Sequence, residues 1–190
     1  MTGRSVRWRL PTSLWPLLLI VLAAGVWAQD DAEAQRLAKF KAVFIYSFID
    51  YVQWPDPAAT DDFVIGVAGD STDTDILPYL QQIAPRRKVG QRNIVVRVIG
   101  EPTATNRSVE ACDILFLPAS ATASIDTVCA RLANAPTLTV GDTHGYAHRG
   151  VGINFVLVEG RLKFEINRGA VTAMGLKMSS ELLKLATIYE

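Results

Sequence analysis

Two cysteines are the side chains of this sequence best suited to redox chemistry. Cys112 opens a predicted strand and Cys129 lies late in the helix predicted to follow it. Because such a helix returns along its strand, both sulfurs can lie at one end of the unit. A disulfide there would close a loop of about 17 residues and contribute ~3 kcal/mol to stability. We favour this bridge, and the alternative is two buried free thiols, which are common in protein cores.

Two histidines are the remaining side chains with potential for metal or acid–base chemistry. His144 and His148 have a spacing that would bring them together on a helix, but Gly141, Gly145 and Gly150 predict a loop instead. Two cysteines alone make a weak zinc site. The sequence also lacks a Gly-x-Ser-x-Gly elbow, a Walker A loop and a Gly-x-Gly-x-x-Gly motif. We therefore expect no enzymatic activity, no metal and no cofactor.

Three polar residues follow predicted strands directly. Asp70, Ser120 and Asp142 come where the first, third and fourth of these strands end. In open parallel sheets, ligands bind outside the carboxyl ends of the strands, where the strand order switches. These residues are therefore candidates for the rim of a ligand crevice. The alternative, which we favour, is that they cap helices and turns.

A second polar set lies near the C-terminus. Glu165, Asn167 and Lys177 are candidates for a polar recognition surface, because Glu165 and Asn167 alternate with apolar residues and share one face of a predicted strand. Lys177 could pair with Glu165 on that face. The alternative is a solvated face whose ion pair contributes less than ~1 kcal/mol.

A helix is predicted over residues 32–53, before Trp54 and Pro55 end it. Its apolar face is so wide that the helix must be central or partly covered by another molecule. We favour a core position. Val43 and Tyr46 nevertheless fall among the polar residues of the helical wheel, so both, together with Trp54, are candidates for apolar contact with a partner.

The rest of the chain alternates strands and helices, which predicts an α/β fold: a three-layer sandwich with a mainly parallel central sheet and helices on both faces. Near the C-terminus, Glu159-Gly160-Arg161 separates two strands and predicts a β-hairpin. Ser179 is a good N-cap for a last helix. The expected strands are 63–69, 94–99, 114–117, 137–140, 151–158 and 162–166, and the expected helices are 74–83, 122–133, 168–174 and 180–188.

The first 28 residues have the pattern of a cleavable signal peptide. Three arginines precede an apolar run over residues 14–24, and Val26-Trp27-Ala28 suits a cleavage site. The run is short for a bilayer span, which takes about 20 residues, although an uncleaved anchor is the alternative. The rest of the chain has 16 basic and 19 acidic residues, a net charge of −3. We therefore expect a single exported domain, residues 29–190, that does not bind nucleic acid.

Five stretches in sequence order resemble the YfiR-like family of periplasmic proteins. They are residues 41–55, 63–70, 112–117, 138–142, and a C-terminal series formed by 152–157, 164–167 and 175–180. Each stretch alone is a weak match, whereas the ordered series is specific and covers nearly all of the chain after the leader. The best-studied type of the family has four cysteines, and this chain has two.

The resemblance implies a periplasmic regulatory protein. The family type represses an inner-membrane diguanylate cyclase by binding its periplasmic domain, and an outer-membrane lipoprotein can sequester the repressor, which promotes cyclic di-GMP synthesis and biofilm. The expected partner is therefore such a cyclase or a sensor kinase, with a lipoprotein or a second copy of the chain as further candidates. The alternative function is binding of a small periplasmic ligand in the strand-end crevice.

Overall fold

The computed structural model describes residues 15–55, 61–70, 75–102 and 107–190, with side chains from residue 31 onward. The chain divides into two units, Met1–Arg36 and Leu37–Glu190. Helix α1 (Trp15–Tyr51) runs through the boundary between them, so it begins well before the predicted position. The predicted signal peptide, residues 1–28, lies outside the residues whose side chains are described. Within the described residues, no helix has the length and apolar character needed to cross a membrane.

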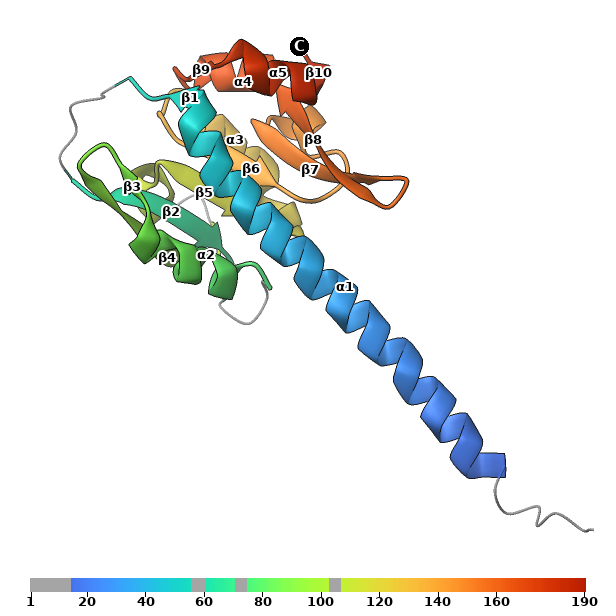
Figure 1. The fold of residues 1–190 in the computed structure, drawn as a ribbon. Helices are drawn as coiled ribbons and strands as arrows, with labels where there is room; N and C mark the ends of the chain where they lie inside the picture. The colour runs from blue at the N-terminus through green and yellow to red at the C-terminus, as the bar shows by residue number, and fades with distance from the viewer. Residues whose placement is uncertain (1–14, 56–60, 71–74, 103–106) are drawn as a thin grey trace, which may run out of the picture. The chain divides into compact units, whose positions relative to one another are not determined.

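An eight-stranded, mostly parallel sheet forms the centre of the second unit (Figure 1). Its strand order is β10-β8-β7-β6-β5-β2-β4-β3, and only the pairs β7–β8 and β3–β4 are antiparallel. The strands are β2 (Phe63–Ala68), β3 (Lys88–Val89), β4 (Arg92–Gly100), β5 (Ile114–Leu117), β6 (Leu138–Gly141), β7 (Ile153–Val158), β8 (Arg161–Asn167) and β10 (Thr187–Tyr189). The predicted α/β class and C-terminal hairpin are confirmed.

Apolar helix faces cover both sides of this sheet. Every residue of β2, β5 and β6 is buried, as continuous apolar runs require when a strand is covered on both faces. Alternate β2 residues belong to two cores: Phe63 and Ile65 pack with α1 and α2 (Leu77–Ile83), whereas Val64 packs with α3 (Ile125–Leu132). In the described ranges, connections between the larger elements include the short 3-10 helices η2 (Ala84–Arg86), η3 (Arg107–Ala111), η4 (Ala119–Ser124) and η5 (Ala147–Arg149).

Aromatic rings pack the hairpin against α1. Phe44 and Phe48 on the helix contact Phe155 on β7 and Phe164 on β8, with ring centroids between 5.4 and 6.2 Å apart across the two elements. The predicted turn has positive φ at both Glu159 (51°) and its following glycine (72°), the geometry of a two-residue hairpin loop whose twist matches the strands.

The C-terminal segment pairs with two separate parts of the domain, β1 (Val52–Gln53) and β8. Strand β9 (Lys177–Met178) pairs with β1 directly after α1, and Ser179 caps α5 (Ser180–Leu185) as predicted. The predicted last helix, 180–188, is too long: it ends at Leu185, and β10 pairs with β8 instead. Thr187, Ile188 and Tyr189 are β-branched or aromatic, and such residues favour strands.

A buried ion pair holds the amino edge of the sheet together. Arg92 at the start of β4 makes two bonds of 2.9 and 3.0 Å to the carboxylate of Asp113, which also accepts the Val64 amide of β2 at 2.7 Å. Arg92 further donates to the carbonyl oxygens of Asp61 and Asp62 and lies over the Phe63 ring. The side chains of Arg92 and Asp113 are only 11% and 14% exposed. The Asp113 carboxylate, which directly precedes β5, therefore connects β5 to β4 through Arg92 and to β2 through Val64.

We predict that Arg92→Met lowers the free energy of unfolding by about 3–5 kcal/mol, because it leaves the Asp113 carboxylate buried without its cation. The matched control is Arg168→Met, which removes an exposed ion pair to Glu190 (56% and 83% exposed) and should cost less than ~1 kcal/mol. Urea unfolding followed by circular dichroism measures both. Equal losses for the two variants would show that the Arg92 pair is not a structural centre.

Candidate functional site

A cavity of about 780 Å³ opens at the carboxyl edge of the sheet. It lies at the end of β2, whose neighbours in the sheet are β4 on one side and β5 on the other. The strand order reverses direction at β2, so this is the switch point of the sheet. Asp70 and Ser120 both line it, so two of the three residues predicted for a crevice come together. Among the described residues, the cavity is lined by Gly69, Asp70, Val98, Gly100, Glu101, Pro102, Ser120, Ala121, Ala123, Ser124 and Thr127.

Asp142, the third predicted crevice residue, lies outside this cavity. Its carboxylate pairs with the Lys41 ammonium of α1 at 2.7 Å, and both side chains are about four-fifths buried (21% and 18% exposed). The prediction assumed that all carboxyl ends would border one crevice. However, β6 is separated from β2 by β5, and α1 supplies a cation to Asp142 instead, so this residue fastens the helix to the end of β6.

The second candidate site is an apolar stripe on α1, formed by Phe40, Val43 and Tyr51. Their exposed fractions are 44%, 47% and 37%. With Ser47 between them, the spacings of three and four residues place all of them on one side of the helix. Val43 is therefore exposed as predicted. Phe40 and Tyr51 were missed because their apolar character assigned them to the core, although their spacing from Val43 was a usable signal.

Tyr46 was predicted to contact a partner, and this prediction is wrong. Its side chain is 1% exposed, and its hydroxyl donates to the Leu80 carbonyl oxygen of α2 at 2.7 Å. Burial raises the pKa of Tyr46 to about 12, which the nearby Arg87 cation partly opposes. Val43 lies three residues earlier, only about 60° away around the helix, so the border between the open and the packed side of α1 passes between these two residues.

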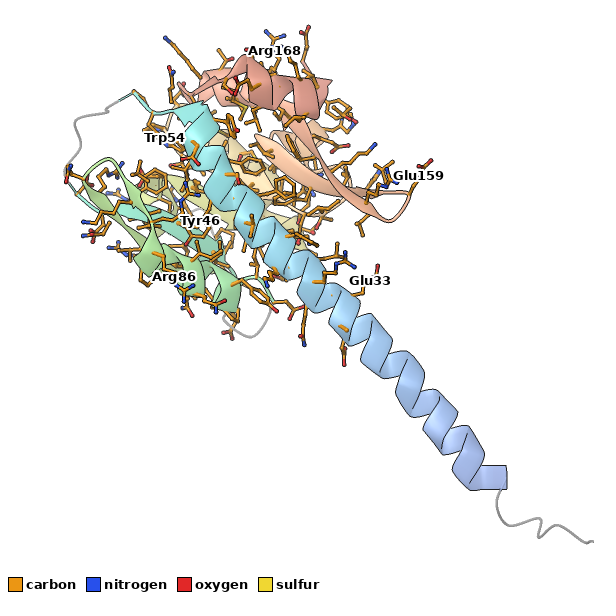
Figure 2. The ribbon with its side chains drawn as sticks, in the orientation of Figure 1. Glu33, Tyr46, Trp54, Arg86, Glu159 and Arg168 are labelled. Atoms are coloured by element: carbon orange, nitrogen blue, oxygen red, sulfur yellow. The ribbon has the colours of Figure 1, made fainter. Side chains whose placement is uncertain are left out.

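Trp54, which is labelled in Figure 2, directly follows β1 and is half-buried. Its indole nitrogen donates to the Asp113 carbonyl oxygen at 3.3 Å, and its ring packs edge-on against Phe63 at 5.1 Å. The remaining face lines a shallow hollow of about 350 Å³ together with Asp61, Asp62 and Glu110. The structure therefore gives Trp54 a packing role at the amino edge and leaves part of its ring at the surface.

Two residues of the predicted C-terminal polar set, Glu165 and Asn167, are half-buried and bond within the domain. Glu165 accepts bonds of 3.1 Å from the Asn154 amide and from the Tyr189 hydroxyl, and these bonds join β7, β8 and β10. The hydrogen bond to Glu165 raises the pKa of Tyr189. Asn167 caps α4 (Arg168–Ala173) through its oxygen and donates to the Ala147 carbonyl at 2.8 Å. These contacts explain Glu165 and Asn167 as structural residues.

Lys177 is separate from that network. It is exposed on β9 of the two-stranded sheet, opposite Gln53, whereas Glu165 lies on β8 of the large sheet. The predicted ion pair between Lys177 and Glu165 is not formed. The prediction treated the two residues as neighbours on one face, but the chain between them folds into α4 and leaves the large sheet.

The predicted disulfide is also not formed in this structure, where both cysteines are buried free thiols. The sulfur of Cys112 donates to the Ser108 carbonyl and packs over Gly66 in β2. Cys129 instead packs against Gly150 after η5. The 3-10 helix η4 delays the start of α3 to Ile125, so Cys129 lies in the middle of that helix. Burial raises the thiol pKa to about 11 for Cys112 and about 12 for Cys129.

The two histidines do not share a helix, because His144 lies in a turn and His148 in η5. The His148 ring packs edge-on against Tyr189 with centroids 4.3 Å apart. Across the described ranges, no three His, Cys, Asp or Glu side chains are grouped so that they could hold a metal ion.

Because the thiol pKa values are raised, we predict that the free energy of unfolding falls at alkaline pH. Since folding raises their pKa above the ordinary value of 9.0, the unfolded chain releases protons that the folded protein retains. The stabilisation is complete below pH 9 and is lost as the pH rises through about 11 to 12. Urea unfolding across this range should show a steeper decline for the wild type than for a Cys112→Ala, Cys129→Ala variant, which retains Tyr46.

An identical decline in both proteins would contradict this assignment. Mass measurement after alkylation of the unreduced, unfolded protein provides the complementary control. Two added labels are expected for free thiols, and none would be added if Cys112 and Cys129 formed a bridge in solution.

Comparisons with known proteins agree with the fold. A family model described as YfiR/HmsC-like matches residues 38–187, a range that includes the cavity and the apolar stripe. Among solved structures, the chain is similar to a conserved domain protein from Vibrio cholerae O1 biovar El Tor strain N16961. The TM-score is 0.57 at 15% sequence identity, over 80% of this chain and 60% of that one. No curated protein matches the chain.

Proposed function

Because the chain belongs to the YfiR/HmsC-like family, we propose that it is a periplasmic regulatory protein that acts by protein contact. Its target is the periplasmic domain of an inner-membrane signalling protein, a diguanylate cyclase or a sensor kinase. An outer-membrane lipoprotein that sequesters the regulator is a further candidate partner. This function requires a recognition surface and no catalytic group.

The apolar stripe of α1 carries the proposal. Phe40, Val43 and Tyr51 present large apolar side chains to solvent on a helix whose opposite side is fully packed. Exposed apolar side chains gathered on one face mark protein-interaction sites more often than singly scattered ones do. The stripe is also rigid, because the same helix contributes Ile45 and Phe48 to the core.

A polar rim borders the stripe. Lys39 lies at one end of it, and at the other Asp50 makes two bonds of 2.8 and 3.0 Å to Arg87 from the segment after η2. An apolar centre with a charged border is the usual anatomy of a specific interface. The exposed pair itself contributes little to stability, so its charges can interact with a partner at small cost.

The required energy is within reach of this surface. Reversing a two-state switch from mostly on to mostly off takes about 5 kcal/mol of differential affinity. Fully burying one large apolar side chain contributes roughly 1.5–3 kcal/mol. Burial of the exposed parts of three such side chains, with the rim contacts, can therefore supply a large share of the difference if the partner offers the complementary surface in one state only.

The test compares two charge insertions in a strain that lacks the gene. We expect deletion to raise the cellular level of cyclic di-GMP, and expression of the wild-type protein to return it to the original low level. Val43→Asp should leave the level high, because a carboxylate in the centre of an apolar contact is strongly unfavourable. The matched control is Leu185→Asp, since Leu185 is even more exposed (72%) but lies on α5 and does not belong to the stripe.

The wild-type protein and Leu185→Asp should co-purify with the cyclase, and Val43→Asp should not. Circular dichroism of both purified variants verifies that each is folded. If Val43→Asp complemented as well as the wild type, the stripe would not be the contact surface. If deletion left cyclic di-GMP unchanged and the protein captured neither a cyclase nor a sensor kinase, the proposed function itself would be wrong.

A further inference from the structure

We propose that the cavity at the carboxyl edge binds a small aliphatic ammonium compound. Independent observations bear on it: the position of the cavity, the charge of its rim, the hydroxyl groups along one wall and an exposed apolar residue inside it. This site is distinct from the α1 stripe and does not depend on protein contact, so the two proposals can fail separately.

Two glycines at strand ends are among the residues that line the cavity. The Gly69 amide donates to the Gly100 carbonyl oxygen at 2.7 Å, which joins the end of β2 to the end of β4. Gly69 has a φ of 97°, and a Cβ atom there would lie 3.3 Å from the Ser120 hydroxyl oxygen. A side chain at this position would therefore be strained and would crowd the wall of the cavity, whereas glycine leaves the space open.

The bridge between these glycines determines the charge of the rim. Asp70 follows Gly69 and Glu101 follows Gly100, so two acidic residues leave neighbouring points of the backbone and both line the cavity. None of the described lining residues is lysine, arginine or histidine. A rim with this charge attracts a cation and repels a carboxylate or a phosphate.

One wall of the cavity offers hydroxyl groups. Ser120, Ser124 and Thr127 have spacings of four and three residues along η4 and the first turn of α3, and all three line the cavity. Ala121 and Ala123 line the cavity between these residues, and their small side chains leave room for a ligand. Hydroxyl oxygens accept hydrogen bonds, and an ammonium group provides three donors. The wall thus complements a cation that also needs hydrogen-bond acceptors.

The ligand must also have an apolar part. Val98 near the end of β4 is 42% exposed and lines the cavity, and methylene groups would remove its surface from water. No aromatic side chain is among the described lining residues, so the cavity lacks the stacking platform expected for a sugar ring or a nucleobase. A short aliphatic amine satisfies the rim, the wall and Val98 together.

The test is calorimetric titration of the purified protein with three probes of equal chain length: butane-1,4-diamine, butane-1,4-diol and succinate. We expect one-to-one binding of the diamine and no binding of the diol or the dianion. The double variant Asp70→Asn, Glu101→Gln should weaken diamine binding at least tenfold. Thr127→Val, which removes one hydroxyl at nearly constant volume, should weaken it less.

The matched control is Glu181→Gln, which removes an exposed carboxylate on α5 and should leave the affinity unchanged. Unfolding midpoints of all variants establish that the fold is intact. Absence of diamine binding up to about 10 mM, a weak limit of affinity, would overturn the proposal. Equal binding of succinate, or a diamine affinity that survives the double substitution, would overturn it as well.

Discussion

The packing of helix α1 across the sheet is the constraint on which the rest of this fold depends. Its buried side contacts three separate parts of the second unit: the hairpin through Phe48, α2 through Tyr46, and the end of β6 through Lys41. Its last residue, Tyr51, accepts the Ser179 amide at 2.9 Å and so connects to the C-terminal segment. Because α1 contacts the hairpin, α2, β6 and the C-terminal segment, its position within the domain is determined by many separate contacts.

This arrangement explains how the outer side of α1 can serve recognition. A surface that is held by a packed core loses little conformational entropy when a partner binds, so more of the contact energy contributes to affinity. Val43 and Tyr46 illustrate the division of roles, since three residues of helix separate a solvent-exposed side chain from one that is 1% exposed. The helix thereby joins stability and recognition in a single element.

Sequence patterns predicted the elements better than the contacts between them. The buried runs of β2 and β5 and the turn at Glu159-Gly160 were recognisable, because burial on both faces and positive φ each demand a particular residue pattern. Tyr46 was misassigned because a helical wheel gives the direction of a side chain without showing that α2 lies beside it. Asp142 was misassigned because its cation, Lys41, is 101 residues away in the chain.

The two edges of the sheet differ in a way that separates structure from function. At the amino edge, Arg92 and Asp113 satisfy one another and the surrounding backbone in an ion pair that is mostly buried. At the carboxyl edge, Gly69 and Gly100 end their strands with positive φ and no side chain, so the same sheet is left open where its strand order switches. Parallel strands make this asymmetry possible, because all of their carboxyl ends meet at one edge. A regulator built in this way can keep a rigid partner surface on α1 and still hold a ligand at a separate place. For such a ligand to influence the partner, it would have to alter the position of α1, and Lys41–Asp142 is the ion pair that joins that helix to the carboxyl edge.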